Sequence, residues 1–346
     1  MAQRANAYGL LRLILAALVV VGHAYLLAGA GPDPLARLVD GRADLQGAAV
    51  AGFFGLSGYL LVPSVLGRTG ASYVRRRAAR ILPGFWVALG LTALVAGPLA
   101  YALADRRGYP WVGADSALSY VAGNAGLLIT QPTIGDATAG LPLAGFLNGS
   151  LWSLLPEALC YAVLLGGALL VDRDGRRLML PAAVGAVALL GAHAWVGGTE
   201  SASLAGWASG PFLAVTGSFA LGVAAAGAVA RGVGLRTIAL AGAVLVALAT
   251  LTLWPGLGDA GAVLLLIGVG GLVRRGPATR LEGRADVSYG VYLLAYPVQQ
   301  LLVIALDGPP LAQAALALAV ALPVALALRI LVELPAQRRL VRGRAA

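Results

Sequence analysis

Two ionisable residues lie inside the first long apolar stretch of the chain. Arg12 is followed by ten residues and then by His23, within an apolar run from Tyr8 to Ala30. A permanent charge and a titratable imidazole are both costly in lipid, so ionisable residues at this depth indicate a functional site. An imidazole takes up and returns a proton near neutral pH, so His23 is a candidate acid–base group.

The composition predicts a membrane protein. Hydrophobic residues make up 59% of the 346 residues, and the mean hydropathy is +0.84. Only 12% of the residues are charged, about half the fraction found in soluble domains. We therefore expect an all-α polytopic membrane protein, with one transmembrane domain over residues 1–346 that forms a bundle of about ten helices.

The expected spans are apolar stretches of about 20 residues, the length that crosses a bilayer. They lie near residues 8–30, 46–66, 81–104, 151–171, 178–197, 209–230, 235–254, 258–274, 286–306 and 311–331. The first is longer than the core of a typical signal peptide and is interrupted by Arg12, so we expect it to be retained rather than cleaved.

The arginines predict the orientation of the helices. With the N-terminus in the cytoplasm, 21 of the 25 arginines fall on the inner side, as the positive-inside rule predicts. A weaker apolar segment at 115–130 would invert this pattern if it crossed, so residues 105–150 are expected to be an external or re-entrant segment. The net charge of +10 then reflects topology and anionic lipid of the cell inner (cytoplasmic) membrane, and no nucleic-acid partner is implied.

A carboxylate is expected at a depth similar to that of His23. Glu157 lies about six residues from the outer end of its span, and His23 about seven from the outer end of the first. A carboxylate that orients or charge-stabilises an imidazole is a recurrent acid–base arrangement. The alternatives stay open: His23 as a core histidine bonded to a carbonyl, and Glu157 as the structural partner of an arginine. We expect His193 to lack an acidic neighbour and to be structural.

Further polar residues lie in the second and third spans. Ser57 and Tyr59 are in mid-span, where Ser57 more simply serves helix packing than nucleophilic attack, and Gly55 and Gly58 would permit close backbone approach. The sequence Arg75-Arg76-Arg77-Ala-Ala-Arg80 precedes the apolar part of the third span. It either faces lipid headgroups or binds a cytosolic polyanion through Arg77 and Arg80, since guanidinium groups suit phosphate geometry. Arg12 would extend such a patch toward His23.

Several motifs occur in a characteristic order along almost the whole chain, about residues 8 to 340. They are Arg12 and His23 with ten residues between them, Phe53-Phe54-x-x-Ser57-Gly58-Tyr59, Arg77-x-x-Arg80-x-x-Pro83, Asn148-Gly149-Ser150-Leu151-Trp152-Ser153-Leu154-x-x-Glu157-x-x-x-Tyr161, Ser288-Tyr289-Gly290-x-Tyr292-Leu293 and Glu333-x-Pro335. Each motif is weak alone, and together they resemble the acyltransferase-3 family of integral-membrane O-acyltransferases.

The resemblance implies about ten spans with cytosolic termini and transfer of an acyl group, usually acetyl from acetyl-CoA, to a hydroxyl of a sugar or glycosylated product. The sequence itself shows no zinc-ligand pattern, and we expect no metal. By position, His23 takes the place of the family's essential histidine and Glu157 that of the motif glutamate. The donor side takes three arginines: Arg12, Arg77 and Arg80. The acceptor side takes five residues: Ser57, Tyr59, Trp152, Ser153 and Tyr161.

The chain departs from the family pattern at two positions. Ala295 stands where many members have a histidine, and Pro156 directly precedes Glu157, where it could reorient the carboxylate. Three alternatives remain: transfer of a succinyl or longer acyl group on the same scaffold, a transporter or flippase in which His23 and Glu157 relay protons, and a non-catalytic binding or assembly role. Transporters often carry internal repeats, and the sequence shows none. It indicates no oligomeric state.

Overall fold

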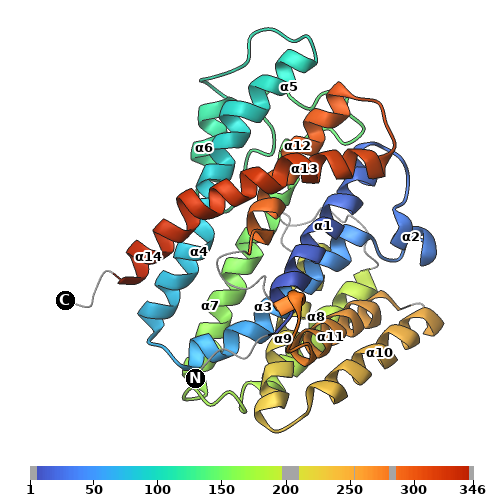
Figure 1. The fold of residues 1–346 in the computed structure, drawn as a ribbon, viewed down its shortest axis with the longest axis vertical. Helices are drawn as coiled ribbons and strands as arrows, with labels where there is room; N and C mark the ends of the chain where they lie inside the picture. Colours follow the sequence, from blue (N-terminus) through green and yellow to red (C-terminus); the bar gives the residue numbers. More distant parts are fainter. Residues whose placement is uncertain (1–5, 197–209, 253, 280–285, 343–346) are drawn as a thin grey trace. The chain divides into compact units, whose positions relative to one another are not determined.

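The computed structural model describes residues 6–196, 210–252, 254–279 and 286–342, and these residues form helices and loops without a strand. The α-helices are α1 (Tyr8–Leu27), α2 (Pro34–Leu38), α3 (Leu45–Leu66), α4 (Gly70–Leu91), α5 (Gly97–Leu103), α6 (Ala117–Asn124), α7 (Leu154–Leu170), α8 (Met179–Val196), α9 (Gly210–Ala230), α10 (Leu235–Thr252), α11 (Pro255–Leu272), α12 (Ser288–Ala305), α13 (Pro310–Leu328) and α14 (Leu334–Arg342). Shorter helical turns are η1 (Thr92–Ala96), η2 (Gly149–Ser153), η3 (Pro277–Thr279) and η5 (Arg329–Glu333). The expected all-α fold is confirmed (Figure 1).

The long helices coincide with the expected spans. Eight helices in the described part of the chain are long and apolar enough to cross a membrane, and Met179–Trp195 and Gly256–Leu272 are shorter apolar helices at two further expected positions. The helix of the expected third span begins earlier than predicted and runs without a break from Gly70 to Leu103. The arginines that precede the apolar stretch are part of the same helix. The side of the membrane on which the termini lie stays a prediction.

The chain divides into two compact units. The first unit comprises Met1–Leu15, Pro34–Tyr73 and Pro156–Ala285, and the second comprises Ala16–Asp33, Val74–Leu155 and Asp286–Ala346. The prediction of a single transmembrane domain is not tested by this division.

Glycines bring helices of the first unit together. A Cβ on Gly58 would collide with the carbonyl oxygen of Phe219, and one on Gly222 with that of Gly55, so α3 and α9 meet backbone to backbone. The close approach expected at Gly55 and Gly58 is confirmed. Small residues serve this purpose in membrane helices, where van der Waals packing drives association. In the same unit α10 runs beside α11 (Figure 1).

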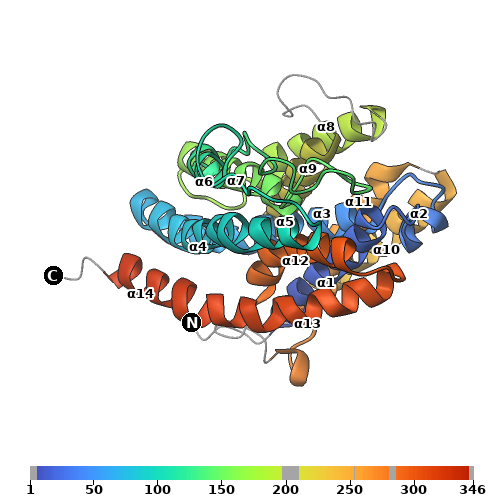
Figure 2. The same ribbon diagram turned by 90° about the horizontal axis from the view of Figure 1, so that it is seen from above.

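The second unit is built around α12. This helix packs against α13, α5, η1 and η2, and its residues from Ser288 to Pro297 are all buried. Figure 2 shows α13 continuing through η5 into α14 as one long helix. The π-turns η1 and η5 interrupt the regular hydrogen bonding of their long helices, and such turns are frequent at functional sites.

The segment expected to be external or re-entrant contains only one short helix before η2 in the described chain. Eight residues of α6 extend about 12 Å, far less than a bilayer core. Side-chain hydrogen bonds hold the loops beside α6. Asn124 Oδ1 accepts a hydrogen bond from the backbone N–H of Thr130 (2.8 Å), and the Tyr109 hydroxyl donates one to the carbonyl of Ala93 (2.5 Å). Burial, together with nearby Tyr101, raises the pKa of Tyr109 to about 12, so this phenol remains a donor. The external placement stays a prediction.

Candidate active site

His23 lies near the C-terminal end of α1, in the second unit, and contacts an aromatic residue of α12. The ring centroids of His23 and Tyr296 are 5.0 Å apart, with the planes at 79°. Tyr296 also lies against Gly149 at the start of η2, where an added Cβ would lie 2.7 Å from the ring. Only glycine fits there, because this turn lies directly against the tyrosine that contacts His23.

Buried amides join α12 to its neighbours in this unit. Gln299 Nε2 donates to the carbonyl of Val20 (2.8 Å), which lies three residues before His23 on α1. Gln300 Nε2 donates to the carbonyl of Phe146 (2.7 Å), and Asn148 Nδ2 donates to that of Leu293 (3.0 Å). The three amide side chains are between 0% and 3% exposed. Gln299 is the amide of this set that contacts α1, the helix of His23.

Glu157 lies in the first turn of α7 and belongs to the first unit. Its Oε1 accepts a hydrogen bond from the hydroxyl of buried Tyr161, one helical turn later. It forms no ion pair within the described residues of its unit, so the arginine pairing considered from the sequence is not seen there. Pro156 fits this turn, since a proline near a helix N-terminus lacks only an N–H that would have no helical partner.

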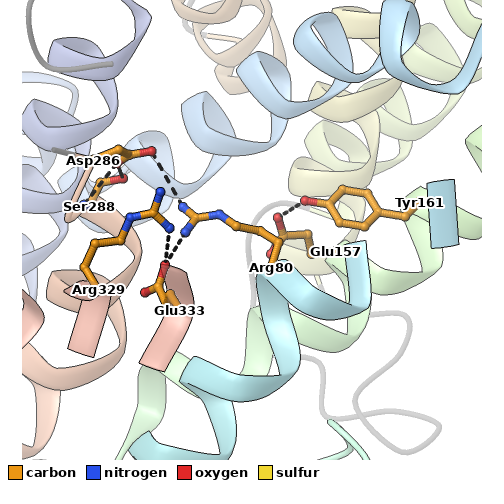
Figure 3. A network of polar contacts seen from close by, with 7 residues as sticks. All are labelled: Arg80, Glu157, Tyr161, Asp286, Ser288, Arg329 and Glu333. Carbon is orange, nitrogen blue, oxygen red and sulfur yellow. Dashed lines mark hydrogen bonds and ion pairs between the residues drawn. The ribbon is translucent and has the colours of Figure 1, made fainter. Parts of the chain in front are cut away.

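Arg80 lies on α4 and takes part in an ion-pair network of the second unit (Figure 3). Its Nη1 lies 2.6 Å from Glu333 Oε2, and its Nη2 lies 3.6 Å from Asp286 Oδ2. Arg329 Nη1 contacts the same Glu333 oxygen at 2.8 Å. Asp286 in turn accepts from the hydroxyl of Ser288 (2.5 Å). Glu333 and Asp286 thus hold Arg80, which the sequence predicted as a ligand for a polyanion.

The other residues predicted from the sequence are placed as follows. Arg12 is half-buried on α1, eleven residues before His23 and therefore about 16 Å along the helix. Arg77 is half-buried on α4, one turn before Arg80. On the expected acceptor side, the Ser153 hydroxyl lies 2.7 Å from that of Tyr292.

The structure also describes the surroundings of three other residues predicted on the acceptor side. Trp152 is 36% exposed on η2. Ser57 is half-buried on α3, and the ring of Tyr59 lies 5.8 Å from that of Tyr8.

Five of the predicted residues belong to the second unit: His23, Arg77, Arg80, Trp152 and Ser153. The first unit holds the other five: Arg12, Ser57, Tyr59, Glu157 and Tyr161. Joint action of His23 and Glu157, which belong to different units, stays a prediction.

Several polar residues of the structure have no role predicted from the sequence. Asp286, Arg329 and Glu333 were not assigned a role, although Glu333 stands in one of the motifs. The expectation that His193 lacks an acidic neighbour is wrong: its Nε2 lies 3.7 Å from Asp259 Oδ2, contributed by α11, which the sequence does not reveal. In the described residues no three His, Cys, Asp or Glu side chains are grouped as they would be to hold a metal ion.

The comparisons with known proteins agree with this architecture. A family model described as an acyltransferase domain, that of acyltransferase-3, matches residues 6–330. The chain belongs to the acyltransferase-3 family. An O-acetyl transferase of Shigella phage Sf6 is 25% identical to this acyltransferase over 329 residues, which cover 87% of this chain and 86% of the relative. No solved structure matches the chain. With its apolar helices, the protein is a multi-pass membrane acyltransferase.

Proposed function

We propose that this acyltransferase moves an acetyl group from acetyl-CoA to a hydroxyl of a saccharide or glycosylated product, in the cytoplasmic (inner) membrane. One observation carries the proposal: His23 lies against Tyr296 in the second unit, where Gln299 binds the helical turn that precedes the histidine. Hydrogen-bonding amides beside an imidazole suit a polar acceptor, and apolar helices alone would not require them. The name of the phage relative, an O-acetyl transferase, supports the same acyl group and bond.

His23 is the general base in this proposal. A ring nitrogen takes the proton of the acceptor hydroxyl while its oxygen attacks the thioester carbonyl, so that a C–O bond forms and the C–S bond breaks. The thiolate of CoA then leaves with the proton that the imidazolium returns. If His23 instead accepts the acyl group first and passes it to the hydroxyl, the products are the same.

Arg77 is the proposed ligand for the CoA phosphates. It lies on the basic, cytosolic end of α4, and a guanidinium binds phosphate through parallel hydrogen bonds. Arg80 is assigned to the same patch by its sequence position, with its side chain anchored to Glu333 and Asp286. Arg12, three turns before His23 on α1, is assigned to the donor side by its place in the order of motifs.

The acceptor side of the proposal rests on sequence position and on local contacts. Glu157 orients or charge-stabilises His23, and Tyr161 holds the carboxylate through its hydroxyl. The remaining residues of this side are Ser57, Tyr59, Trp152 and Ser153. Tyrosine, tryptophan and hydroxyl side chains suit a sugar, which offers both an apolar face and hydroxyl groups.

The test is CoA release by purified protein in nanodiscs, with acetyl-, succinyl- and palmitoyl-CoA compared, with and without a mixture of host glycans. We expect release from acetyl-CoA that rises with glycans. Faster release from succinyl-CoA or palmitoyl-CoA would favour the corresponding acyl group on the same scaffold. No release from any thioester by folded protein would refute the proposal, and proton-coupled uptake by vesicles without acyl-CoA would indicate transport instead.

A matched pair of variants controls this experiment. The chain has two histidines, and His193 lies in the first unit beside Asp259, whereas His23 lies in the second. We expect His23→Asn to abolish CoA release and His193→Asn to retain it. Equal release from both variants would contradict the role of His23.

A further inference from the structure

Several buried amide side chains in the second unit share one hydrogen-bonding state. Asn148, Gln299 and Gln300 each use the amide nitrogen as a donor to a backbone carbonyl. A carbonyl only accepts hydrogen bonds, so these contacts fix the orientation of each amide. Asn148 Oδ1, Gln299 Oε1 and Gln300 Oε1 are all buried without a hydrogen-bond partner among the described residues. The second unit therefore contains buried acceptor oxygens that a hydrogen-bond donor would stabilise.

Gln299 is the member of this set that lies beside His23. Its nitrogen binds Val20, one turn before His23, and residues three apart lie on the same face of a helix. On α12, Tyr296 lies three residues before Gln299 and touches the imidazole. Both helices therefore place the Gln299 amide within about one turn, or 5 Å along the axis, of the imidazole.

We propose that Gln299 Oε1 is a substrate-binding acceptor that takes a hydrogen bond from a second hydroxyl of the acceptor molecule, beside the hydroxyl that His23 deprotonates. The acceptor class is accordingly a polyol ring with two neighbouring hydroxyls, and a simple alcohol lacks the second group. This inference rests on the proposed acyl transfer and adds the residue that selects the acceptor. Gln300 instead binds the carbonyls of Leu143 and Phe146, and Asn148 binds that of Leu293.

The chemistry of a buried amide explains why the second hydroxyl matters. An unsatisfied buried acceptor is costly, and a site built to bond a substrate hydroxyl discriminates strongly against an analogue that lacks it. A hydroxyl that donates to Gln299 Oε1 removes this cost, and it fixes which neighbouring oxygen faces the imidazole. Gln299 thus sets both acceptor preference and the site of acylation on the ring.

A competition experiment tests the inference. The protein in nanodiscs receives acetyl-CoA with equal concentrations of cyclohexanol and a cyclohexane-1,2-diol, cis or trans, and the two acetate esters are quantified by mass spectrometry. The ratio is corrected for the two hydroxyls of the diol and for the ratio given by free imidazole. We expect a corrected preference of about tenfold or more for at least one diol.

Variants assign that preference to Gln299. Gln299→Met keeps the length of the side chain, removes the amide and should bring the ratio close to one. Gln313→Met is the matched control, because Gln313 is also buried, donates to a carbonyl, that of Leu306 (3.1 Å), and leaves its Oε1 without a partner among the described residues. Leu306 lies seven residues beyond Gln299, about 10 Å along the helix direction. We expect Gln313→Met to keep the wild-type ratio.

The outcomes separate this inference from the function on which it rests. If the wild-type protein gives a corrected ratio of diol ester to cyclohexanol ester near one, the inference about Gln299 is wrong, whatever the variants show. This result is expected if only water donates hydrogen bonds to the amide oxygens. A slower Gln299→Met variant with an unchanged ratio also overturns it and leaves Gln299 as an anchor between α12 and α1. If neither alcohol is acylated while His23-dependent thioester hydrolysis continues, the inference fails and the acyl chemistry stands. Absence of His23-dependent thioester cleavage refutes both.

Discussion

Replacing Glu333 with glutamine removes the central charge of the network in the second unit. Glu333 is 1% exposed, and its Oε2 lies 2.6 Å from Arg80 Nη1 and 2.8 Å from Arg329 Nη1. Glutamine preserves the shape of the side chain and leaves an oxygen that accepts one hydrogen bond. The other carboxylate of the network, Asp286, lies 3.6 Å from Arg80 Nη2.

The distances between these charged groups allow an estimate of how much unfolding free energy the Glu333→Gln variant loses. Two unit charges about 4 Å apart attract by about 4 kcal/mol at an effective dielectric constant of about 20. Removing one partner of a buried ion pair costs about 3–5 kcal/mol, because the other charge stays buried without compensation. We therefore expect Glu333→Gln to lower the free energy of unfolding by about 4 kcal/mol.

Equilibrium unfolding in mixed micelles of detergent and SDS, followed by tryptophan fluorescence, measures this change. Asp174→Asn is the control, since Asp174 and Arg177 form a pair at 3.5 Å with side chains 45% and 64% exposed. Such an exposed pair contributes about 0–1 kcal/mol. A Glu333→Gln loss as small as the control would refute the network.

The double variant Arg329→Gln/Glu333→Gln sharpens the result. It removes one charge of each sign and leaves Arg80 with Asp286, so its unfolding free energy should exceed that of Glu333→Gln alone. Additive losses from the two substitutions would show that the charges do not interact.

Three further changes test other parts of the site. Arg77→Gln should raise the KM for acetyl-CoA about tenfold or more, since a hydrogen bond to a charged group contributes about 1.5–3 kcal/mol; steady-state CoA release measures this, and an unchanged KM would contradict phosphate binding. Tyr161→Phe removes the hydrogen-bond donor to Glu157 and should lower kcat about tenfold, with little change in the KM for acetyl-CoA. An unchanged kcat would show that this hydrogen bond is only structural. Gly58→Ala drives a Cβ into a carbonyl oxygen of α9 and should cost about 3 kcal/mol of unfolding free energy; Gly166→Ala, where no atom lies within 4 Å of an added Cβ, should be neutral or stabilising, and equal effects of the two would refute the close crossing.

Local patterns in the sequence predicted most of the helices and one contact surface. Apolar length located the spans, and the glycines of the second span, Gly55 and Gly58, indicated the close approach to another helix. The spacing of Glu157 and Tyr161 also places them one turn apart, and the structure joins them by a hydrogen bond. These features depend on residues close together in the sequence.

Partners far apart in the sequence could not be predicted in this way. Arg80 and Glu333 are separated by 253 residues, and a positive charge near a membrane surface suits lipid headgroups and phosphate as well as a carboxylate. His193 and Asp259 come together only through the packing of α8 and α11.

One feature was readable from the sequence and was overlooked. Gln299 and Gln300 are adjacent polar residues within an apolar span, directly after Pro297 and Val298. Polar residues at such depth face the interior of a bundle and mark functional sites. Their spacing from Tyr292 and Tyr296 also indicates one polar face of the helix, which the structure places at the centre of the second unit.

Transfer of isotopically labelled acetyl from acetyl-CoA to a methyl glycoside, followed by mass spectrometry of the product, tests the central claim most directly. The comparison uses wild-type protein, His23→Asn and His193→Asn, each in nanodiscs and each shown to be folded. We predict a labelled ester, released by mild alkali, from the wild type and His193→Asn and none from His23→Asn. The same ester formed by His23→Asn at the wild-type rate would contradict the account.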